Sequence, residues 1–264
     1  MQKPKWVVEK EQARRKAAAE TVWLFGLHAV RDALLNPRRE KLRLILTKNA
    51  ADRLADAVAA AGMTAEIADP RKFPAPIDPD SVHQGAALEV RPLDWGRLED
   101  LAMAATGDGA ERRAPVMVLL DRVTDPHNAG AILRSAEVFG ARAVVAPARY
   151  SAPETGALAK TASGALERQP YLRVKNLSDA IGTLKDMGYR VLGLDGEAEL
   201  ALGEALAEAT DRPVALVLGA EGPGLREGTK AACDALVRIE AAGEFGSLNV
   251  SNAAAIALYA TQRR

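Results

Sequence analysis

The sequence has little cysteine, few aromatic residues and no excess charge of either sign. Its 264 residues include one cysteine, Cys233, so a single chain can build neither an internal disulfide nor a cysteine metal cluster. Lys plus Arg equals Asp plus Glu, at 35 each. The overall charge therefore gives no direct support to a nucleic-acid partner, and any such contact has to come from local patches.

Long apolar runs are also missing. No stretch approaches the roughly 18 apolar residues that a membrane-spanning helix needs, and the lysines of residues 1–10 are not followed by the apolar segment of an export signal. We therefore expect neither membrane insertion nor export. Because the single cysteine suits a reducing compartment, we expect a cytoplasmic protein.

The composition, 48% hydrophobic and 27% charged, is typical of a globular protein, and the length suggests two small domains. Residues 1–21 form a charged extension, which is either a basic contact patch or a solvated tail. Residues 22–92 predict a small α/β domain. A helix at 28–35 is followed by a strand at 42–47, a helix at 50–61 ended by Gly62, and a strand at 63–68.

Residues 93–114 mix alanine, glycine and charge, and predict a linker with some helix. Residues 115–264 predict a second domain, in which continuous apolar runs alternate with helical segments such as 177–187. That alternation indicates a largely parallel sheet covered by helices, and ligands usually lie beyond the carboxyl ends of such strands. The expected strands are 116–120, 143–146, 190–194, 214–218 and 235–239.

The first motif, residues 121–134, leaves a strand, crosses a proline turn and enters a helix. If that helix begins near Ala129, Asn128 stands at its N-cap and Arg134 in its second turn. Free N–H groups and a guanidinium there could hold a phosphate or a ribose hydroxyl. The spacing alone favours the simpler interpretation, in which Asn128 caps the helix and Arg134 pairs with an acid. His127 could be a general base, but a turn or packing role is favoured.

The second motif, residues 216–225, takes an apolar strand into a glycine-rich turn. Its pattern is G-x-x-G-x-G, which is not the dinucleotide fingerprint G-x-G-x-x-G, and Pro223 removes one N–H from a phosphate cradle. A nicotinamide or ATP site is therefore disfavoured. Glu221 is either a carboxylate that faces a ligand or an acid favoured by a helix dipole.

The third motif, residues 247–252, precedes a helix that is rich in alanine. Ser247, Asn249 or Ser251 could each cap this helix. Its small side chains would permit close packing against a backbone, a ligand or a second subunit.

Taken in this order, Asn128-x-Gly130-x-x-x-Arg134, Gly219-Ala-Glu-Gly222 and Ser247-Leu-Asn-Val-Ser251 resemble motifs 1, 2 and 3 of the SpoU/TrmH RNA 2'-O-methyltransferases. The resemblance implies a SPOUT-type parallel-sheet domain with a C-terminal trefoil knot, an exception to unknotted topology. It also implies a homodimer with its sites at the subunit interface, and S-adenosyl-L-methionine as cofactor. The reaction it implies needs no metal.

The first domain narrows the resemblance. Phe25-Gly-Leu-His-Ala-Val30 and His83-Gln-Gly85 look like parts of the L30e-like substrate-binding domain of the RlmB branch, which methylates a guanosine ribose of 23S rRNA. The TrmH branch, which modifies tRNA, lacks this domain, whereas thiostrepton-resistance methyltransferases carry a similar one. The expected substrate is therefore 23S rRNA. The alternatives are tRNA, another rRNA ribose, or a non-catalytic RNA-binding assembly factor.

The resemblance also assigns residues. It implies that Gly219, Ile239 and Leu248 hold the adenosine part of the cofactor, largely through backbone groups. The residues that it implies for the reacting centre are Asn128, Arg134, Glu221, Ser247 and Asn249. Because a guanidinium keeps its proton in proteins, we expect Arg134 to position phosphate and ribose rather than to act as the base. A phosphate oxygen, Glu221 or water would take the proton.

Two residues depart from the family pattern. Glu240 stands where a proline is usual, and Asn252 stands where an apolar residue is usual. Both flank the segment assigned to the cofactor, so cofactor affinity does not follow from the resemblance.

Overall fold

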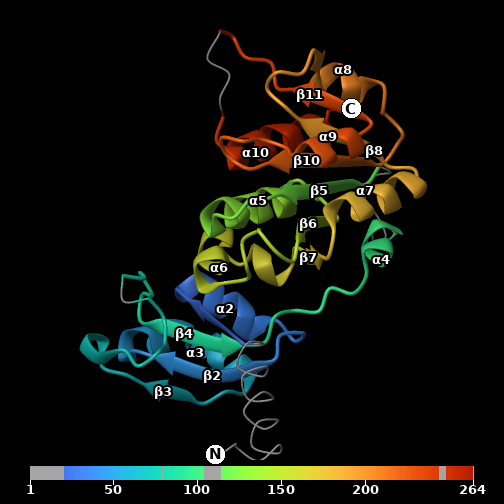
Figure 1. Ribbon diagram of the computed structural model, residues 1–264. Helices are drawn as coiled ribbons and strands as arrows, with labels where there is room; N and C mark the ends of the chain where they lie inside the picture. The colour runs from blue at the N-terminus through green and yellow to red at the C-terminus, as the bar shows by residue number, and fades with distance from the viewer. Residues whose placement is uncertain (1–20, 79, 104–113, 244–247, 264) are drawn as a thin grey trace, which may run out of the picture. The chain divides into compact units, whose positions relative to one another are not determined.

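The computed structural model describes residues 21–78, 80–103, 114–243 and 248–263, which form two compact units (Figure 1). One unit contains the described residues up to Asp94 together with Glu154–Lys160, and the other contains the rest. The predicted extension, apart from Thr21, and residues 104–113 of the predicted linker lie outside the described residues. Within the described ranges, no helix is both long and apolar enough to cross a membrane.

The first unit is built on a four-stranded sheet in the order β1-β4-β2-β3. Its elements are β1 (Val22–Phe25), α2 (Leu27–Leu35), β2 (Lys41–Leu46), α3 (Lys48–Ala61), β3 (Ala65–Ile67), the 3-10 helix η1 (Pro70–Lys72) and β4 (Ala86–Val90). Strand β4 pairs antiparallel with β1 and β2, whereas β2 and β3 are parallel. The predicted elements are confirmed, with Gly62 in the left-handed conformation after α3. Strands β1 and β4 were not anticipated, because β1 is short and β4 begins with two alanines.

Two loops of the first unit meet where the sequence resembles a substrate-binding domain. The side chain of Gln84 accepts a hydrogen bond from the backbone N–H of Leu27 at 3.1 Å, which satisfies a free donor at the start of α2. Next to it, Gly85 has a φ of +77°, and a Cβ there would lie 2.2 Å from Oγ1 of Thr47. Because Thr47 also caps α3, glycine at position 85 is needed for this close approach.

The second unit is built on a seven-stranded sheet in the order β7-β6-β5-β10-β8-β11-β9, with every pair parallel. Its strands are β5 (Val116–Asp121), β6 (Ala143–Pro147), β7 (Tyr171–Val174), β8 (Arg190–Leu194), β9 (Leu200–Ala201), β10 (Val214–Gly219) and β11 (Ala235–Arg238). Its helices are α4 (Leu98–Met103), α5 (Pro126–Val138), α7 (Leu177–Asp186), α8 (Leu202–Ala207), α9 (Glu227–Ala232), α10 (Val250–Thr261) and the 3-10 helix η2 (Ala165–Glu167). Helix α6 (Gly156–Ala162) is shared, because its residues up to Lys160 belong to the first unit. The five predicted strands and the parallel sheet are confirmed.

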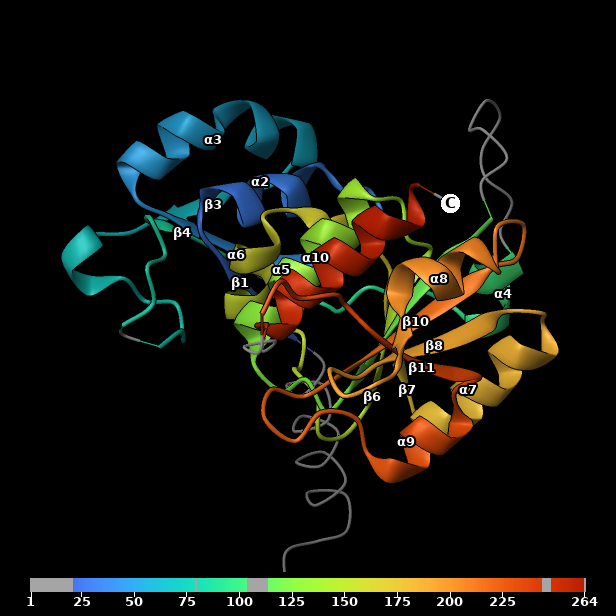
Figure 2. The same ribbon diagram turned by 90° about the horizontal axis from the view of Figure 1, so that it is seen from above.

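Helices cover both faces of this sheet, which is why its central strands read as continuous apolar runs. All six residues of β5 are buried. Figure 2 shows α5 and α10 on one face and α7 and α9 on the other. The core on the α7 face joins α4, α7 and α9 to alternate residues of β5, β6, β8 and β10. Because helices cover both faces, the loops at the carboxyl ends of the strands are where a ligand can reach the sheet.

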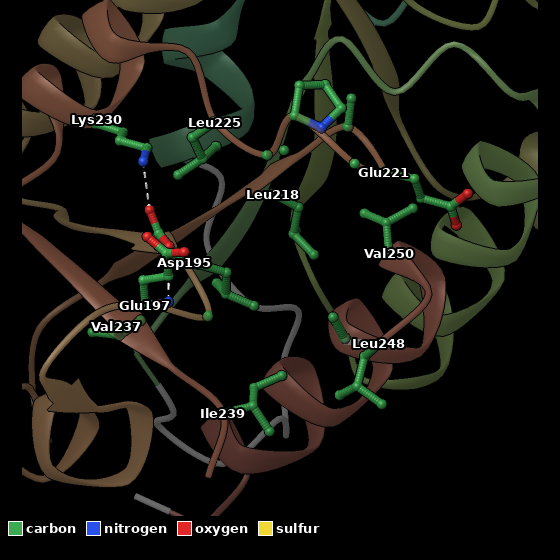
Figure 3. A pocket seen from close by; sticks show the side chains of 18 residues that line it. Asp195, Glu197, Leu218, Glu221, Leu225, Lys230, Val237, Ile239, Leu248 and Val250 are labelled. Carbon is green, nitrogen blue, oxygen red and sulfur yellow. Dashed lines mark hydrogen bonds and ion pairs between the residues drawn. The ribbon is translucent and has the colours of Figure 1, made fainter. Parts of the chain in front are cut away.

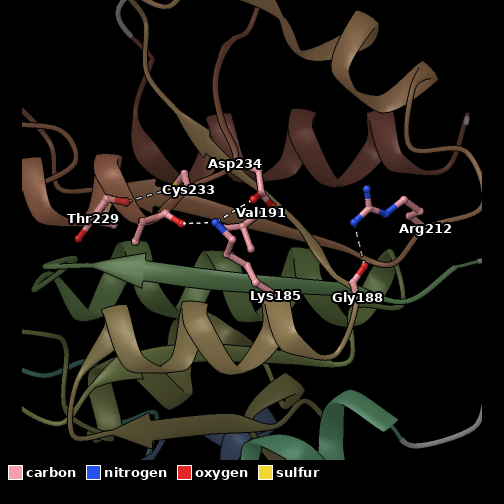
Figure 4. Close-up of polar contacts among 8 residues, drawn as sticks. Lys185, Gly188, Val191, Arg212, Thr229, Cys233 and Asp234 are labelled. Atoms are coloured by element: carbon pink, nitrogen blue, oxygen red, sulfur yellow. Dashed lines mark hydrogen bonds and ion pairs between the residues drawn. The ribbon is translucent and has the colours of Figure 1, made fainter.

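A polar cluster holds the turn before β11 against β8 (Figure 4). Asp234 pairs with Lys185 at 2.8 Å and accepts a hydrogen bond from the backbone N–H of Val191 at 2.8 Å. Burial raises the pKa of Asp234, but these two partners outweigh it and the pKa is lowered overall. The neighbouring Cys233 donates to the carbonyl of Thr229, and burial, aided by Asp234, raises the pKa of its thiol to about 11. Cys233 therefore stays a neutral packing residue.

Candidate functional site

Helix α5 begins earlier than the sequence predicted. It starts at Pro126, and the carboxylate of Asp125 caps it by accepting a hydrogen bond from the N–H of His127 at 2.9 Å. The fixed φ of proline suits the first helical position, and aspartate is a strong N-cap. The prediction that Asn128 caps the helix is therefore wrong. Asn128 lies within the first turn, and its side chain is free to contact other segments.

Three predicted residues of the reacting centre are joined by hydrogen bonds. The side-chain amide of Asn128 donates to Oε1 of Glu221 at 3.1 Å, and the amide of Asn249 donates to Oδ1 of Asn128 at 3.0 Å and also to Oε1 of Glu221. These residues come from α5, from the glycine-rich turn after β10 and from the start of α10. Three segments that lie 28 to 121 residues apart in the sequence thus fix one carboxylate oxygen between two amides.

Asn249 also decides where α10 begins. Its Oδ1 accepts hydrogen bonds from the backbone N–H of Ser251 at 2.9 Å and from the Ser251 hydroxyl at 2.5 Å. Of the three capping candidates considered from the sequence, Asn249 is the one that caps. Its amide has two ends, so one side chain caps the helix with its oxygen and holds Glu221 with its nitrogen.

The glycine-rich turn is folded back onto the end of β10. Ala220 and Gly224 form an isolated bridge, and a Cβ on Gly219 would lie 2.2 Å from the carbonyl carbon of Gly224. The turn is held to β5 by Asp121, whose fully buried carboxylate accepts from the backbone N–H of Arg226 at 3.0 Å and from its Nε at 2.7 Å. The conformation of the turn therefore depends on glycine at position 219.

Beyond the carboxyl ends of β8, β10 and β11 lies a pocket of about 580 Å³. Gly219, Ile239 and Leu248, the three predicted cofactor residues, all line it, together with Leu218 and Val237. Figure 3 shows Leu218, Ile239 and Leu248 around the cavity. The apolar wall and the bare backbone of the turn suit a flat, largely apolar group such as a nucleobase.

Acidic side chains from the loop after β8 also line the pocket, and the sequence analysis missed them. Asp195 pairs with Lys230 at 2.7 Å, and this hydrogen bond lowers the pKa of Asp195 and raises that of Lys230. Figure 3 shows Asp195 and Glu197 on one side of the pocket and Glu221 on the other. The available signal was their position directly after a predicted strand, at the edge where ligands bind.

The remaining predicted residues lie elsewhere. Arg134 is in the third turn of α5 rather than the second, and it is exposed. Its guanidinium forms no hydrogen bond or ion pair with another residue in the described ranges, so the expected pairing with an acid is also absent there. Ser247 lies outside the described residues. Glu240 and Asn252 are exposed and do not line the pocket.

Comparison with known protein families assigns this chain to one of them. The model of the SpoU rRNA Methylase family matches residues 115–259, which are 145 of the 264 residues. The chain belongs to the SpoU rRNA methylase family. A second model, described as RNA 2'-O ribose methyltransferase substrate binding, matches residues 23–95. The two matches fall mainly in the two different units.

Relatives of this SpoU chain carry related names. A Ralstonia nicotianae protein named 23S rRNA (guanosine-2'-O-)-methyltransferase RlmB is 38% identical over 91% of this chain and 95% of its own length. A Synechocystis protein named uncharacterized tRNA/rRNA methyltransferase is 46% identical over 67% of this chain, a match that spans 44% of that relative. A solved AdoMet-bound rRNA methyltransferase from Sinorhizobium meliloti has a TM-score of 0.76 at 23% identity, covering 95% of this chain and 90% of that one. This confirms the mixed α/β fold with its parallel sheet.

Proposed function

We propose that this protein transfers a methyl group from S-adenosyl-L-methionine to the 2'-hydroxyl of a guanosine ribose in 23S rRNA. The observation that carries the proposal is the hydrogen-bonded cluster of Asn128, Glu221 and Asn249, with Glu221 itself lining the pocket. The name of the Ralstonia relative supports the choice of substrate. We place the reaction in the cytoplasm, where rRNA is modified.

The pocket fits the cofactor chemically. Its apolar side chains suit an adenine ring, the backbone beside Gly219 can approach a ligand closely, and Asp195 and Glu197 offer carboxylates to hydroxyl or ammonium groups. When bound, S-adenosyl-L-methionine supplies an electrophilic sulfonium methyl. The role of Gly219, Ile239 and Leu248 is to hold the adenosine part beside Glu221.

The amide cluster prepares the reacting carboxylate. Because Asn128 and Asn249 both donate to Oε1 of Glu221, the second oxygen of this carboxylate is left to accept the hydrogen bond of the ribose hydroxyl. The amides fix the direction of that oxygen before the substrate arrives, which lowers the cost of orientation. Ser247 belongs to the same motif and would contact the substrate or the cofactor.

Arg134 acts from a second subunit in this proposal. It lies six residues after Asn128 on α5, a rotation of about 240° along an α-helix, so the two side chains leave different faces. Large apolar side chains are exposed near it on α5 and α10: Val138 is 71% exposed, Tyr259 50% and Ile256 41%. Helices α5 and α10 contact each other, and together they form an apolar face suited to a homodimer. Arg134 would reach across that face to the phosphate and ribose at its partner's site.

Two finer features of the fold belong to the same proposal. Residues 22–92, which make up most of the first unit, would be an L30e-like domain that presents the RNA, joined by the 93–114 linker to the methyltransferase domain at 115–264. The C-terminal segment would form a trefoil knot. In support, β11 lies between β8 and β9 near one edge of the sheet, yet α10 contacts α5, α8 and the central strand β10 (Figure 2).

The test is to incubate the purified chain with S-adenosylmethionine labelled in its methyl group and with separate pools of unmodified 23S rRNA, 16S rRNA and tRNA. Label at the 2'-oxygen of one 23S guanosine is the expected result. Label in tRNA alone would move the assignment to tRNA modification. Cofactor binding without label in any pool, or in intact ribosomal particles, would contradict methyl transfer. An Arg134→Lys enzyme with normal turnover would contradict bidentate positioning by Arg134.

A further inference from the structure

Two exposed side chains at the carboxyl ends of β5 and β6 form a cation–π pair that the reaction proposed above does not use. The guanidinium carbon of Arg122 lies 5.4 Å from the ring centroid of Tyr150. Arg122 follows the last residue of β5, and Tyr150 lies three residues beyond the end of the neighbouring strand β6. The ring is widely open to solvent, since Tyr150 is 71% exposed.

Both residues have backbones that non-glycine residues seldom adopt. The φ angle is +60° at Arg122 and +60° at Tyr150. Each such conformation is unfavourable for a residue that has a Cβ, and one exposed cation–π contact stabilises the structure by less than the two backbone conformations together destabilise it. The contact between the two side chains does not offset the two backbones, so other parts of the structure must hold them.

Strand β7, which pairs with β6, holds the backbone of the Tyr150 loop in place. Arg173 of β7 donates to three carbonyl groups of the Tyr150 loop: Pro147 at 3.2 Å, Ala148 at 3.0 Å and Ala152 at 2.9 Å. The hydroxyl of Tyr171 donates to the carbonyl of Ala152 at 2.7 Å.

The same loop is tied to the loop of Arg122. The backbone N–H of Ala152 donates to the carbonyl of Val123 at 2.9 Å. Ser151, the buried residue that follows Tyr150, donates to the carbonyl of Pro147. The two loops thus form one rigid support that holds the Tyr150 ring exposed to water, so the ring contributes no burial energy to the fold.

A second arginine lies next to the pair in the chain. Arg149 precedes Tyr150 and is exposed, and neither Arg149 nor Arg122 forms an ion pair with an acid in the described ranges. A flat aromatic ring, a guanidinium plane and free positive charge are the features that bind single-stranded RNA, whose bases stack while its phosphates pair with arginine.

Their place in the sheet relates them to the proposed chemistry. Asp121 at the end of β5 is in register with Gly219 of β10, and six residues after Arg122 comes Asn128. The pocket lies on the β10 and β8 side of β5, whereas Tyr150 lies on the β6 side. A nucleotide held at Asn128 and Glu221 would have its neighbour in the strand directed along the same sheet edge.

We propose that Arg122 and Tyr150 form a stacking platform for an unpaired base that neighbours the methylated nucleotide, with Arg149 contacting its phosphate. The platform rests on the proposed RNA methyltransferase function and adds to it a determinant of RNA binding. It contributes to RNA affinity and leaves cofactor affinity unchanged.

Two substitutions of Tyr150 distinguish the contribution of its ring to RNA binding from any effect on folding. Tyr150→Gly removes the ring and relieves the positive φ, so it should not lower the melting temperature. Tyr150→Phe keeps the ring. The dissociation constant of each full-length variant for unmodified 23S rRNA is measured by filter binding with S-adenosylhomocysteine present, and cofactor affinity is measured by calorimetry.

We expect Tyr150→Gly to weaken RNA binding roughly 5- to 150-fold, the range measured for loss of one stacked base, and Tyr150→Phe to bind like the natural protein. Arg149→Ala should reduce the slope of log affinity against log salt by about one, whereas Tyr150→Gly should leave that slope unchanged. Natural affinity for RNA in Tyr150→Gly, or equal losses in the glycine and phenylalanine variants, would overturn the platform.

Failure of the platform and failure of the proposed function give different results. If the natural protein methylates 23S rRNA but Tyr150→Gly binds it normally, only the platform is wrong. If Tyr150→Gly weakens the binding of 23S rRNA but the natural protein transfers no methyl group, the platform stands and the proposed reaction is wrong. A loss seen with ribosomal particles but not with naked rRNA would assign Tyr150 to a protein contact and overturn RNA stacking.

Discussion

Asn249 performs two tasks with one side chain, because an amide carries an acceptor and a donor at its two ends. The oxygen caps α10 through Ser251, and the nitrogen reaches Asn128 and Glu221. A capping residue is usually interchangeable with serine or aspartate. At this position a substitution that preserves the cap still removes the contact with Glu221, so the two tasks can be separated by experiment.

We expect Asn249→Ser to keep the helix cap but to lower turnover roughly 100-fold, a typical effect of removing one donor from a reacting centre. Its melting temperature and cofactor affinity should stay close to those of the natural protein. Asn249→Ala should lose activity and, in addition, about 1 kcal/mol of stability with the cap. Asn252→Ser, on the exposed side of α10, is the control. Full turnover by Asn249→Ser would show that the amide has no part in the reaction.

At the scale of single elements, the glycine-rich turn after β10 shapes the pocket more than any one side chain does. The turn closes over its own first residue and is fastened to β5 by the pair of Asp121 and Arg226. Strand β10 stays buried through Leu218, and the chain can reverse directly after Gly219 because no side chain stands in the way. The pocket is therefore a property of the backbone path.

Gly219→Ala should disrupt this path, because the new Cβ would lie 2.2 Å from the carbonyl carbon of Gly224, and backbone cannot move aside as a flexible side chain can. We expect loss of cofactor binding by calorimetry together with a lower melting temperature. Gly228→Ala is the matched control. No atom lies within 4 Å of its added Cβ, and alanine in helix α9 should raise stability by about 0.5 to 1 kcal/mol. A Gly219→Ala protein that binds the cofactor normally would contradict the role of the turn.

At the scale of the whole molecule, the proposed reaction is incomplete in one chain. Asn128, Glu221 and Asn249 are gathered in a single subunit, whereas Arg134 lies on the outside of α5 beside exposed apolar side chains. A dimer with two-fold symmetry places the same apolar face of each subunit against the other. Each site would then be formed by an amide cluster from one chain and an arginine from its partner.

Complementation tests this arrangement. Arg134→Ala and Asn249→Ser should each be nearly inactive alone. After subunits are unfolded and refolded together in equal amounts, half of the dimers are mixed and each mixed dimer has one complete site, so activity should return to about a quarter of the natural level. A mixture as inactive as its components would mean that Arg134 serves its own chain. If sedimentation shows a monomer at the concentration of the activity assay, the proposed dimer is wrong.

The parts of this molecule that follow from neighbouring residues could be predicted from the sequence. Apolar runs gave the five main strands of the parallel sheet, Gly62 gave the end of α3, and motif order gave the family. Strands β1, β4, β7 and β9 were not anticipated. Strand β1 has only four residues, and the other three contain alanine or arginine, so these segments become strands through the neighbours they pair with. The start of α5 was misplaced because Asp125 and Asn128 are both good caps, and only one can be at the end.

What only the tertiary structure decided is which distant residues meet. No local pattern relates Asn128 to Glu221 and Asn249, which are 93 and 121 residues away, and none turns Asp195 toward the same pocket. Nor does the sequence show that two loops braced by Arg173 hold Tyr150 out in water. Helix and strand signals reflect the periodicity and size of adjacent side chains, whereas these contacts arise from the order in which parallel strands join the sheet. That order brings their carboxyl ends to one edge and so decides the site.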